Sequence, residues 1–150
     1  MKKKFIKGLK LNKGFYYDIV KPLIESNYPD LKYSSGLIGY GSDVLGFDTY
    51  ISMDHNWGPR LIIFLPDNNF ELYREKLDNL FRKELPYEYK GFPVNFTDPK
   101  EDGVQSMERI EEGEVNHLIE ITSVKKYLSR YLGVESIENI QLIDWLKFSD

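Results

Sequence analysis

The stretch from residue 39 to residue 60 constrains this chain most, because it places polar and flexible residues directly before a buried strand. It contains four glycines, three aspartates, a histidine, a tryptophan and an arginine. It leads into residues 61–65, the most apolar run of the sequence and the best candidate for a central strand. Polar residues at the mouth of a buried strand commonly form a site in α/β folds. We therefore expect the functional chemistry at this junction.

The composition is that of one soluble globular domain. The 150 residues are 41% hydrophobic and 29% charged, enough for one core within a single domain over residues 1–150. The formal net charge of −4 argues against general nucleic-acid binding, which usually needs a basic surface. The net negative charge does not exclude a nucleotide that binds through a metal ion.

Other features of the sequence predict the cellular compartment of the protein. The sequence has no cysteine, which excludes disulfides, thiolate catalysis and zinc–thiolate sites and fits a reducing compartment. The three lysines after Met1 resemble the start of a signal peptide, but only Phe5 and Ile6 follow before Lys7. No apolar run approaches the length of a membrane span. We expect a cytoplasmic protein with no membrane association.

The hydrophobic pattern predicts helices alternating with short strands. Asn12 is the predicted N-cap of a helix over residues 13–27, with a kink or restart at Pro22. Ser123 is the predicted N-cap of another helix, which ends at Gly133. The clearest helix covers residues 70–85. Its predicted buried stripe is Phe70, Tyr73, Leu77, Leu80, Phe81 and Leu85.

The remaining segments complete a small sheet. Strands are predicted at residues 32–38, 54–65, 91–96 and 115–122, and a helical tail is predicted over residues 136–148. Residues 98–113 are acidic and rich in turn formers, which predicts an exposed loop, or a lid beside the site. This order predicts an α+β fold, α/β-like in sequence order, with a small mixed β-sheet flanked by helices.

Gly41 and Ser42 follow a predicted strand and precede a short helical turn. Glycine allows a ligand to approach the backbone closely, and amides at the start of a helix favour anions such as phosphate. A Gly-Ser pair is more often a plain turn than a ligand site. We keep both interpretations, with phosphate binding as the functional one.

Asp54 and Asn56 lie two residues apart on a predicted strand, and such residues point to the same face. Two carboxylates placed in this way can hold Mg²⁺, which in turn binds a triphosphate. A third carboxylate from a neighbouring strand can complete the metal site and accept a proton from an acceptor hydroxyl. Glu120, on the predicted strand 115–122, is the candidate for that position.

The order of strand, Gly-Ser, short helix and a strand with an Asp-x-Asp-like pair resembles the nucleotidyltransferase superfamily that includes DNA polymerase beta. The run GYGSDVLGFDTYISMDHNWGPR is similar to the core of an uncharacterised bacterial family within that superfamily. The resemblance implies a nucleotidyltransferase-like fold, a nucleoside triphosphate with Mg²⁺, and transfer of a nucleoside monophosphate to a hydroxyl. It implies that Gly41 and Ser42 bind phosphate, that Asp54, Asn56 and Glu120 hold the metal, and that Asp54 and Glu120 are catalytic.

This sequence differs from that family pattern in two ways. The family usually carries Asp where this chain has Asn56, and a neutral amide should bind a divalent cation more weakly. The family generally continues into a mostly helical second half, whereas this sequence stops at Asp150. We therefore expect the acceptor pocket to be missing or to come from a helical protein partner.

Neighbouring residues allow structural and functional interpretations. A hydrogen-bonding role is favoured for His55, and core packing for Trp57 over base stacking. Arg60 suits a bound phosphate or an ion pair with Asp48 about equally well. Asp43 and Asp48 are expected to cap or orient the turn rather than to bind a ligand.

Three functions remain open from the sequence. The first is a nucleotidyltransferase-like domain, with Arg60 as a further nucleotide contact. The second is a catalytically degenerate domain that binds a nucleotide weakly or binds another protein, which Asn56 favours. The third is an unrelated α+β domain in which residues 39–60 are a structural turn.

Overall fold

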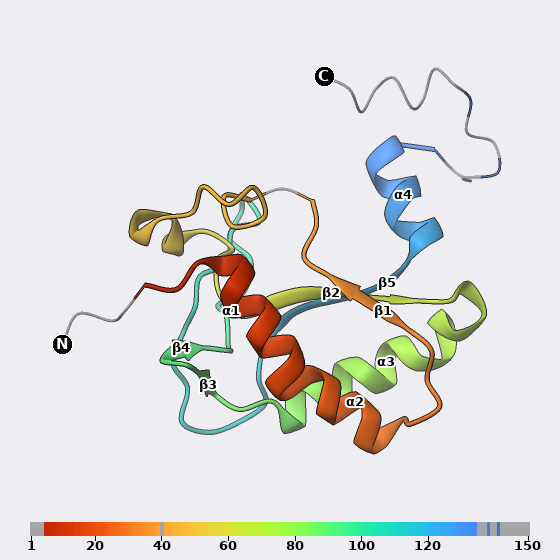
Figure 1. Ribbon diagram of the computed structural model, residues 1–150, viewed down its shortest axis with the longest axis horizontal. Helices are drawn as coiled ribbons and strands as arrows, with labels where there is room; N and C mark the ends of the chain where they lie inside the picture. Colours follow the sequence, from red (N-terminus) through yellow and green to blue (C-terminus); the bar gives the residue numbers. More distant parts are fainter. Residues whose placement is uncertain (1–4, 40, 135–137, 139–140, 142–150) are drawn as a thin grey trace.

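The protein is an α+β domain around a three-stranded mixed sheet (Figure 1). The computed structural model describes residues 5–39, 41–134, 138 and 141, without the Asp54 side chain. The strands are β1 (Ser34–Gly36), β2 (Arg60–Leu65) and β5 (Leu118–Ser123), in the order β1-β2-β5. β2 pairs antiparallel with β1 and parallel with β5. This confirms the predicted small mixed sheet flanked by helices.

The N-terminal helix begins earlier than predicted. It consists of α1 (Gly8–Phe15), a π-helical turn (Tyr16–Val20) and α2 (Lys21–Asn27). The wide π turn ends at Val20, and α2 restarts at Lys21 with Pro22 in its first turn, in agreement with the predicted kink or restart there. The N-cap prediction for Asn12 is wrong, because Asn12 is buried within α1.

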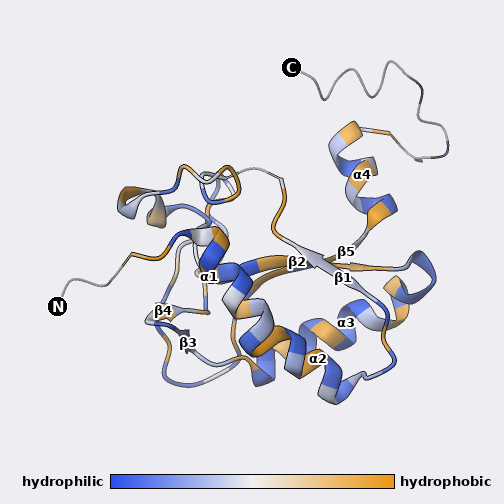
Figure 2. Cartoon of the chain, viewed as in Figure 1, coloured by the Kyte–Doolittle hydropathy of each residue, from blue (hydrophilic) through white to orange (hydrophobic). Residues whose placement is uncertain are grey.

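Helix α3 (Asp67–Glu84) confirms the strongest helix prediction, although it starts at Asp67 rather than at Phe70. Its Phe70, Leu77 and Phe81 are buried, as is Leu85 after its end. These side chains join one hydrophobic cluster with α1, α2 and one face of the sheet. The sheet contributes Leu61, Ile63, Leu65 and Ile119 to that cluster. Apolar residues of these elements are orange in Figure 2.

Helix α4 (Val124–Leu132) follows β5 without a loop, as predicted. The Ser123 hydroxyl accepts the Lys126 N–H at 3.3 Å, and Gly133 ends the helix in the left-handed conformation (φ 64°). The predicted tail over residues 136–148 lies outside the described residues, apart from Glu138 and Gln141. Figure 1 shows α4 standing at one end of the sheet, apart from the other helices.

All four predicted strands are longer than the observed ones, and two of them differ most. The segment predicted at residues 91–96 contributes only β4 (Phe92–Pro93), which pairs with β3 (Glu88–Tyr89), and an isolated bridge from Phe96 to Met107. The described loop 98–113 contains no helix or strand apart from that bridge, as predicted.

The strand predicted from residue 54 begins only at Arg60. Tyr50–Asp54 is a 3₁₀ helix instead, and Asn56 has a left-handed backbone (φ 46°). Gly58 packs so closely on the next loop that a Cβ there would lie 2.8 Å from Met107 Sδ. The chain therefore turns between Asp54 and Arg60, and the prediction that Asp54 and Asn56 share one strand face is wrong.

Candidate functional site

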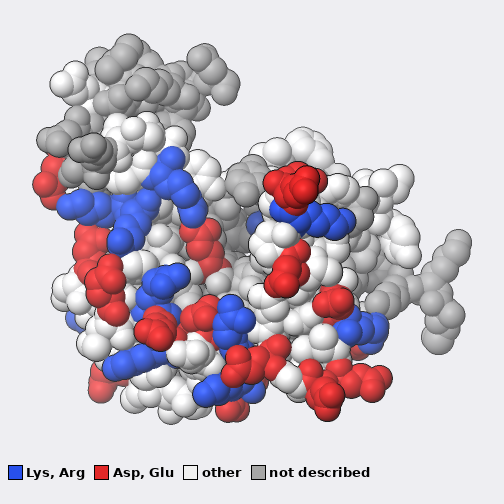
Figure 3. Space-filling model, turned by 180° about the vertical axis from the view of Figure 1, so that it is seen from behind, with Lys and Arg blue, Asp and Glu red and all other residues white. Residues whose placement is uncertain are grey.

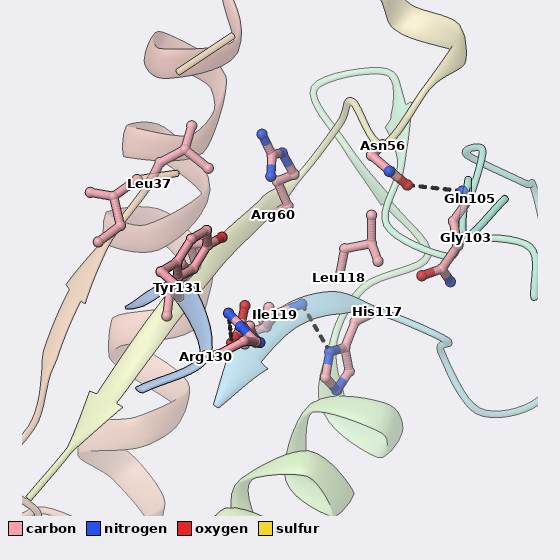
Figure 4. Close-up of a pocket in the computed structure, with 14 residues that line it drawn as sticks. Leu37, Asn56, Arg60, Gly103, Gln105, His117, Leu118, Ile119, Arg130 and Tyr131 are labelled. Carbon is pink, nitrogen blue, oxygen red and sulfur yellow. Dashed lines mark hydrogen bonds and ion pairs between the residues drawn. The ribbon is translucent and has the colours of Figure 1, made fainter. Parts of the chain in front are cut away.

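One face of the sheet is covered by helices α1 to α3, and the opposite face borders a cavity. Side chains alternate along a strand, so Ile62 and Glu120, which are paired in the β2–β5 register, lie on the face opposite to Ile63. A cavity of about 590 Å³ lies there, with a partly apolar lining that includes Ile38, Ile62 and Leu118 (Figure 4). Its polar lining comes from Asn56, Arg60, Gln105, Glu120, Arg130 and Tyr131.

The Gly41–Ser42 turn borders a second, smaller cavity. This cavity, of about 340 Å³, is lined by Gly41, Ser42 and His55, among others. Gly41 has a positive φ of 128°, and a Cβ there would lie 2.6 Å from Asp43 Oδ1 and 2.8 Å from Arg60 Nη2. The turn therefore requires glycine, because any side chain would strain the backbone and displace the ion pair beside it.

Arg60 is paired with Asp43 rather than with Asp48. Its Nε and Nη2 donate to the two carboxylate oxygens of Asp43 at 3.0 and 2.7 Å, a bidentate contact. The Asp43 side chain is 2% exposed and that of Arg60 18% exposed. The predicted pairing of Arg60 with Asp48 is therefore wrong, and Arg60 is oriented from the turn itself.

Asp48 connects the turn to the start of helix α1. Its buried carboxylate accepts the Gly8 N–H at 2.6 Å and the Trp57 Nε1–H at 3.0 Å. Lys7 Nζ lies 3.6 Å from Asp48 Oδ1. A carboxylate at a helix N-terminus is also favoured by the helix dipole. The predicted orienting role of Asp43 and Asp48 is confirmed, as is the core position of Trp57, which is 1% exposed.

Asn12 connects α1 to the first residue of β2. Its Nδ2 donates to the Gly8 carbonyl at 2.9 Å, and its Oδ1 accepts the Arg60 N–H at 2.6 Å. The side chain therefore satisfies one polar group at each of two elements that are far apart in sequence. Sequence reasoning missed this role, together with the contributions of Lys7 and Gly8.

Asn56 is joined to the acidic loop. Its N–H donates to the Gln105 carbonyl at 2.9 Å, and its Oδ1 accepts the Gln105 N–H at 2.8 Å, the contact drawn in Figure 4. Gln105 and Gly103 also line the sheet cavity, so this loop forms one of its walls. Movement of the loop as a lid stays a prediction.

Glu120 lines the sheet cavity and has an ion-pair partner that the sequence did not indicate. Arg130 of α4 places Nη2 2.8 Å from Glu120 Oε1. The Glu120 side chain is 36% exposed and that of Arg130 55% exposed, so the pair lies at the open rim of the cavity. No pattern in the sequence singles out Arg130, although it lies on the helix that directly follows the strand of Glu120.

His117 is the buried titratable group next to this cavity. Its Nδ1 accepts the Ile119 N–H at 3.1 Å, so the neutral ring carries its proton on Nε2. Nε2 lies 3.4 Å from Asp78 Oδ1 and has no hydrogen-bond partner among the described residues. Burial lowers the pKa of His117, and the nearby Asp78 charge opposes that shift.

The predicted metal ligands are only partly placed. The Asp54 side chain lies outside the described residues, although its backbone ends the 3₁₀ helix beside the smaller cavity. Among the described residues, no group of three or more histidine or acidic side chains could hold a metal ion. The Asn56 carbonyl keeps a second lone pair, and Glu120 supplies a carboxylate, both donor types suited to Mg²⁺.

Searches against protein-family models, curated proteins and solved structures gave no match for this chain. Within the described residues, no helix has the length and apolar character needed to cross a membrane. On the face shown in Figure 3, basic side chains alternate with acidic ones and form no single basic surface. The case for a function therefore rests on the two cavities and their residues.

Proposed function

We propose that this domain binds a nucleoside triphosphate with Mg²⁺ and transfers its nucleoside monophosphate to a hydroxyl acceptor, as a nucleotidyltransferase-like protein. One observation carries the proposal. Asn56 and Arg60 line both the cavity at Gly41–Ser42 and the cavity that contains Glu120. The proposed phosphate turn and the proposed acidic group therefore border neighbouring spaces that share two polar residues.

The proposed roles follow from the chemistry of each group. Gly41 and Ser42 line the small cavity, where the phosphates would lie against the backbone of the turn. Arg60, held by Asp43, would add positive charge beside the phosphates. Asp54, Asn56 and Glu120 would hold Mg²⁺, which when bound neutralises phosphate charge. Glu120 would accept the proton of the acceptor hydroxyl.

A second candidate is a domain that binds nucleotide without turnover. Two observations favour it, since Asn56 Oδ1 already accepts a backbone N–H and Glu120 is already paired with Arg130. Both would have to share or exchange these partners in order to bind a metal ion. A neutral amide at position 56 also brings no charge to a divalent cation.

Calorimetric titration tests nucleotide binding directly. We would titrate ATP, GTP and CTP, each with and without Mg²⁺, into the wild type, Asp54→Ala and the control Asp30→Ala. Asp30 is exposed and belongs to neither cavity. The expected result is Mg²⁺-dependent binding that is lost in Asp54→Ala and retained in the control. Absence of binding for all three nucleotides would overturn the proposal.

Asn56→Asp separates the two candidates. Aspartate tolerates the left-handed backbone and can still accept the Gln105 N–H, so the loop contact should persist. We expect the added charge to strengthen Mg²⁺-dependent nucleotide binding by roughly tenfold, about the effect of one charged contact. Unchanged binding would favour the domain without a metal-dependent site.

A further inference from the structure

The Glu120–Arg130 ion pair is exposed enough for either side chain to exchange its partner for a ligand. Its distance of 2.8 Å is that of a strong ion pair, but the side chains are 36% and 55% exposed. Ion pairs in such positions contribute little net stability, because water solvates both charges when they separate. Both groups also line the sheet cavity, where a ligand would meet them.

Arg130 does not depend on Glu120 for its position. Its guanidinium carbon lies 5.4 Å from the ring centre of Tyr127 and 5.2 Å from that of Tyr131. Cation–π contacts of this kind are favourable without any acid. Burial raises the pKa of Tyr127 to about 12, so this ring stays neutral near pH 7. If Glu120 separated from Arg130, the two rings would still hold the guanidinium at the cavity.

Helix α4 also contacts the segment that leads into the phosphate turn. Gly39 has a φ of 101°, and a Cβ there would lie 3.2 Å from the hydroxyl oxygens of both Tyr127 and Tyr131. The same tyrosines that flank Arg130 therefore abut the chain just before Gly41. Figure 4 shows Tyr131 and Arg130 together on the side of the cavity near Ile119. The cavity at Gly41 and the cavity at Arg130 share Asn56 and Arg60, so a ligand that spans both cavities would meet this arginine.

We propose that Arg130 binds phosphate in exchange for Glu120, so that triphosphate binding releases the Glu120 carboxylate into the cavity. The inference rests on the proposed nucleotide site and adds the order of events within it. Guanidinium forms bidentate hydrogen bonds with phosphate, and an exposed ion pair with a carboxylate costs little to break. Arg130 is thus a ligand contact, and Glu120 becomes available for a metal ion or a proton only when phosphate is present.

A double-mutant cycle with inorganic tripolyphosphate tests the exchange. Without Mg²⁺, we would titrate the wild type, Glu120→Gln, Arg130→Gln and the double variant by calorimetry. Glu120→Gln should tighten binding by roughly 1.5- to 5-fold, because the phosphate no longer competes with an exposed ion pair. Arg130→Gln should weaken binding by roughly tenfold, the effect of one charged hydrogen-bonded contact. In the Arg130→Gln background, Glu120→Gln should bring no gain.

The control is Glu71→Gln, which removes the same charge from an exposed pair with Lys126 outside both cavities. It should leave binding unchanged. An equal gain from Glu120→Gln with and without Arg130 would overturn the exchange, because simple removal of a repelling charge would then explain it. Circular dichroism would confirm that each variant is folded.

The outcome also separates this inference from the function on which it rests. If Asp54-dependent binding of ATP with Mg²⁺ is found but the cycle is additive, the nucleotide site stands and the exchange is wrong. If neither ATP nor tripolyphosphate binds the wild type, both are wrong. Binding of ATP without any binding of tripolyphosphate would likewise overturn the role of Arg130.

Discussion

Two arginine–carboxylate pairs border the candidate site, and their surroundings differ sharply. Arg60 pairs with Asp43 beneath the Gly41 turn, where the carboxylate is 2% exposed. Arg130 pairs with Glu120 at the rim, where the carboxylate is 36% exposed. The same two chemical groups thus form a fixed contact at one end and an exchangeable contact at the other. Burial, more than distance, decides which pair keeps its partner and which can exchange it for a ligand.

The largest effect should come from the buried side, at Asp48. Asp48→Ala leaves the Gly8 N–H and the Trp57 Nε1–H without their acceptor in a buried position. We expect a loss of roughly 3 kcal/mol in the free energy of unfolding, measured by urea denaturation. Asp48→Asn keeps an acceptor oxygen and should lose less. A loss below about 1 kcal/mol in Asp48→Ala would contradict the prediction that buried carboxylates stabilise this fold more than exposed ones.

The next effect should appear in the pH dependence of stability, through His117. Its folded-state pKa is lowered, chiefly by burial, so the unfolded chain takes up the proton first as the pH falls. The stability that it contributes is present above the unfolded pKa of about 6.5 and is lost as the pH falls through the folded value. Protonation of His117 would also place a hydrogen on Nδ1, which accepts the Ile119 N–H in the neutral ring.

Urea denaturation at a series of pH values between about 8 and 5 measures this effect, with the range set by the usual pKa of histidine. The difference between wild type and His117→Gln isolates the histidine from the acidic groups that titrate lower. Asp78 and Arg82 of α3 face the ring and should be unchanged in both proteins. A constant difference across the series would contradict the predicted depression of the pKa.

The smallest effect should come from the rim. Glu120→Gln and Arg130→Gln should each change the free energy of unfolding by no more than about 0.5 kcal/mol, because both partners remain solvated. The same urea experiment as for Asp48 applies. A loss near that of Asp48→Ala in either variant would contradict the prediction that the exposed Glu120–Arg130 pair contributes little to stability.

The elements with strong local patterns were predictable from sequence. Helix α3 follows from the spacing of Phe70, Leu77 and Phe81, and α4 from the cap at Ser123 and the stop at Gly133. These features act within a few residues and need no tertiary partner. Asn12 looked like a cap for the same local reason, but its partner Arg60 lies 48 residues away. No local pattern reports a contact of that range.

The candidate site was predictable in its outline and less so in its pairing. The sequence predicted one site for Gly41, Arg60 and Glu120. The structure places Arg60 and Glu120 at one cavity and Gly41, with Arg60, at a second cavity. The sequence did not show that Asp43 would orient Arg60, or that Arg130 would pair with Glu120. Ion pairing depends on the positions of side chains across elements, which composition and periodicity do not specify.

The bridge made by Asn12 has a consequence for ligand affinity. Asn12 fixes the start of β2 to α1, while Asp48 fixes the turn segment to Gly8 of the same helix. The backbone around the small cavity is thereby ordered when the chain folds, so the protein would lose little conformational entropy there when a ligand binds. Substitutions in α1 that touch no ligand could then lower affinity, simply by returning that freedom to the turn.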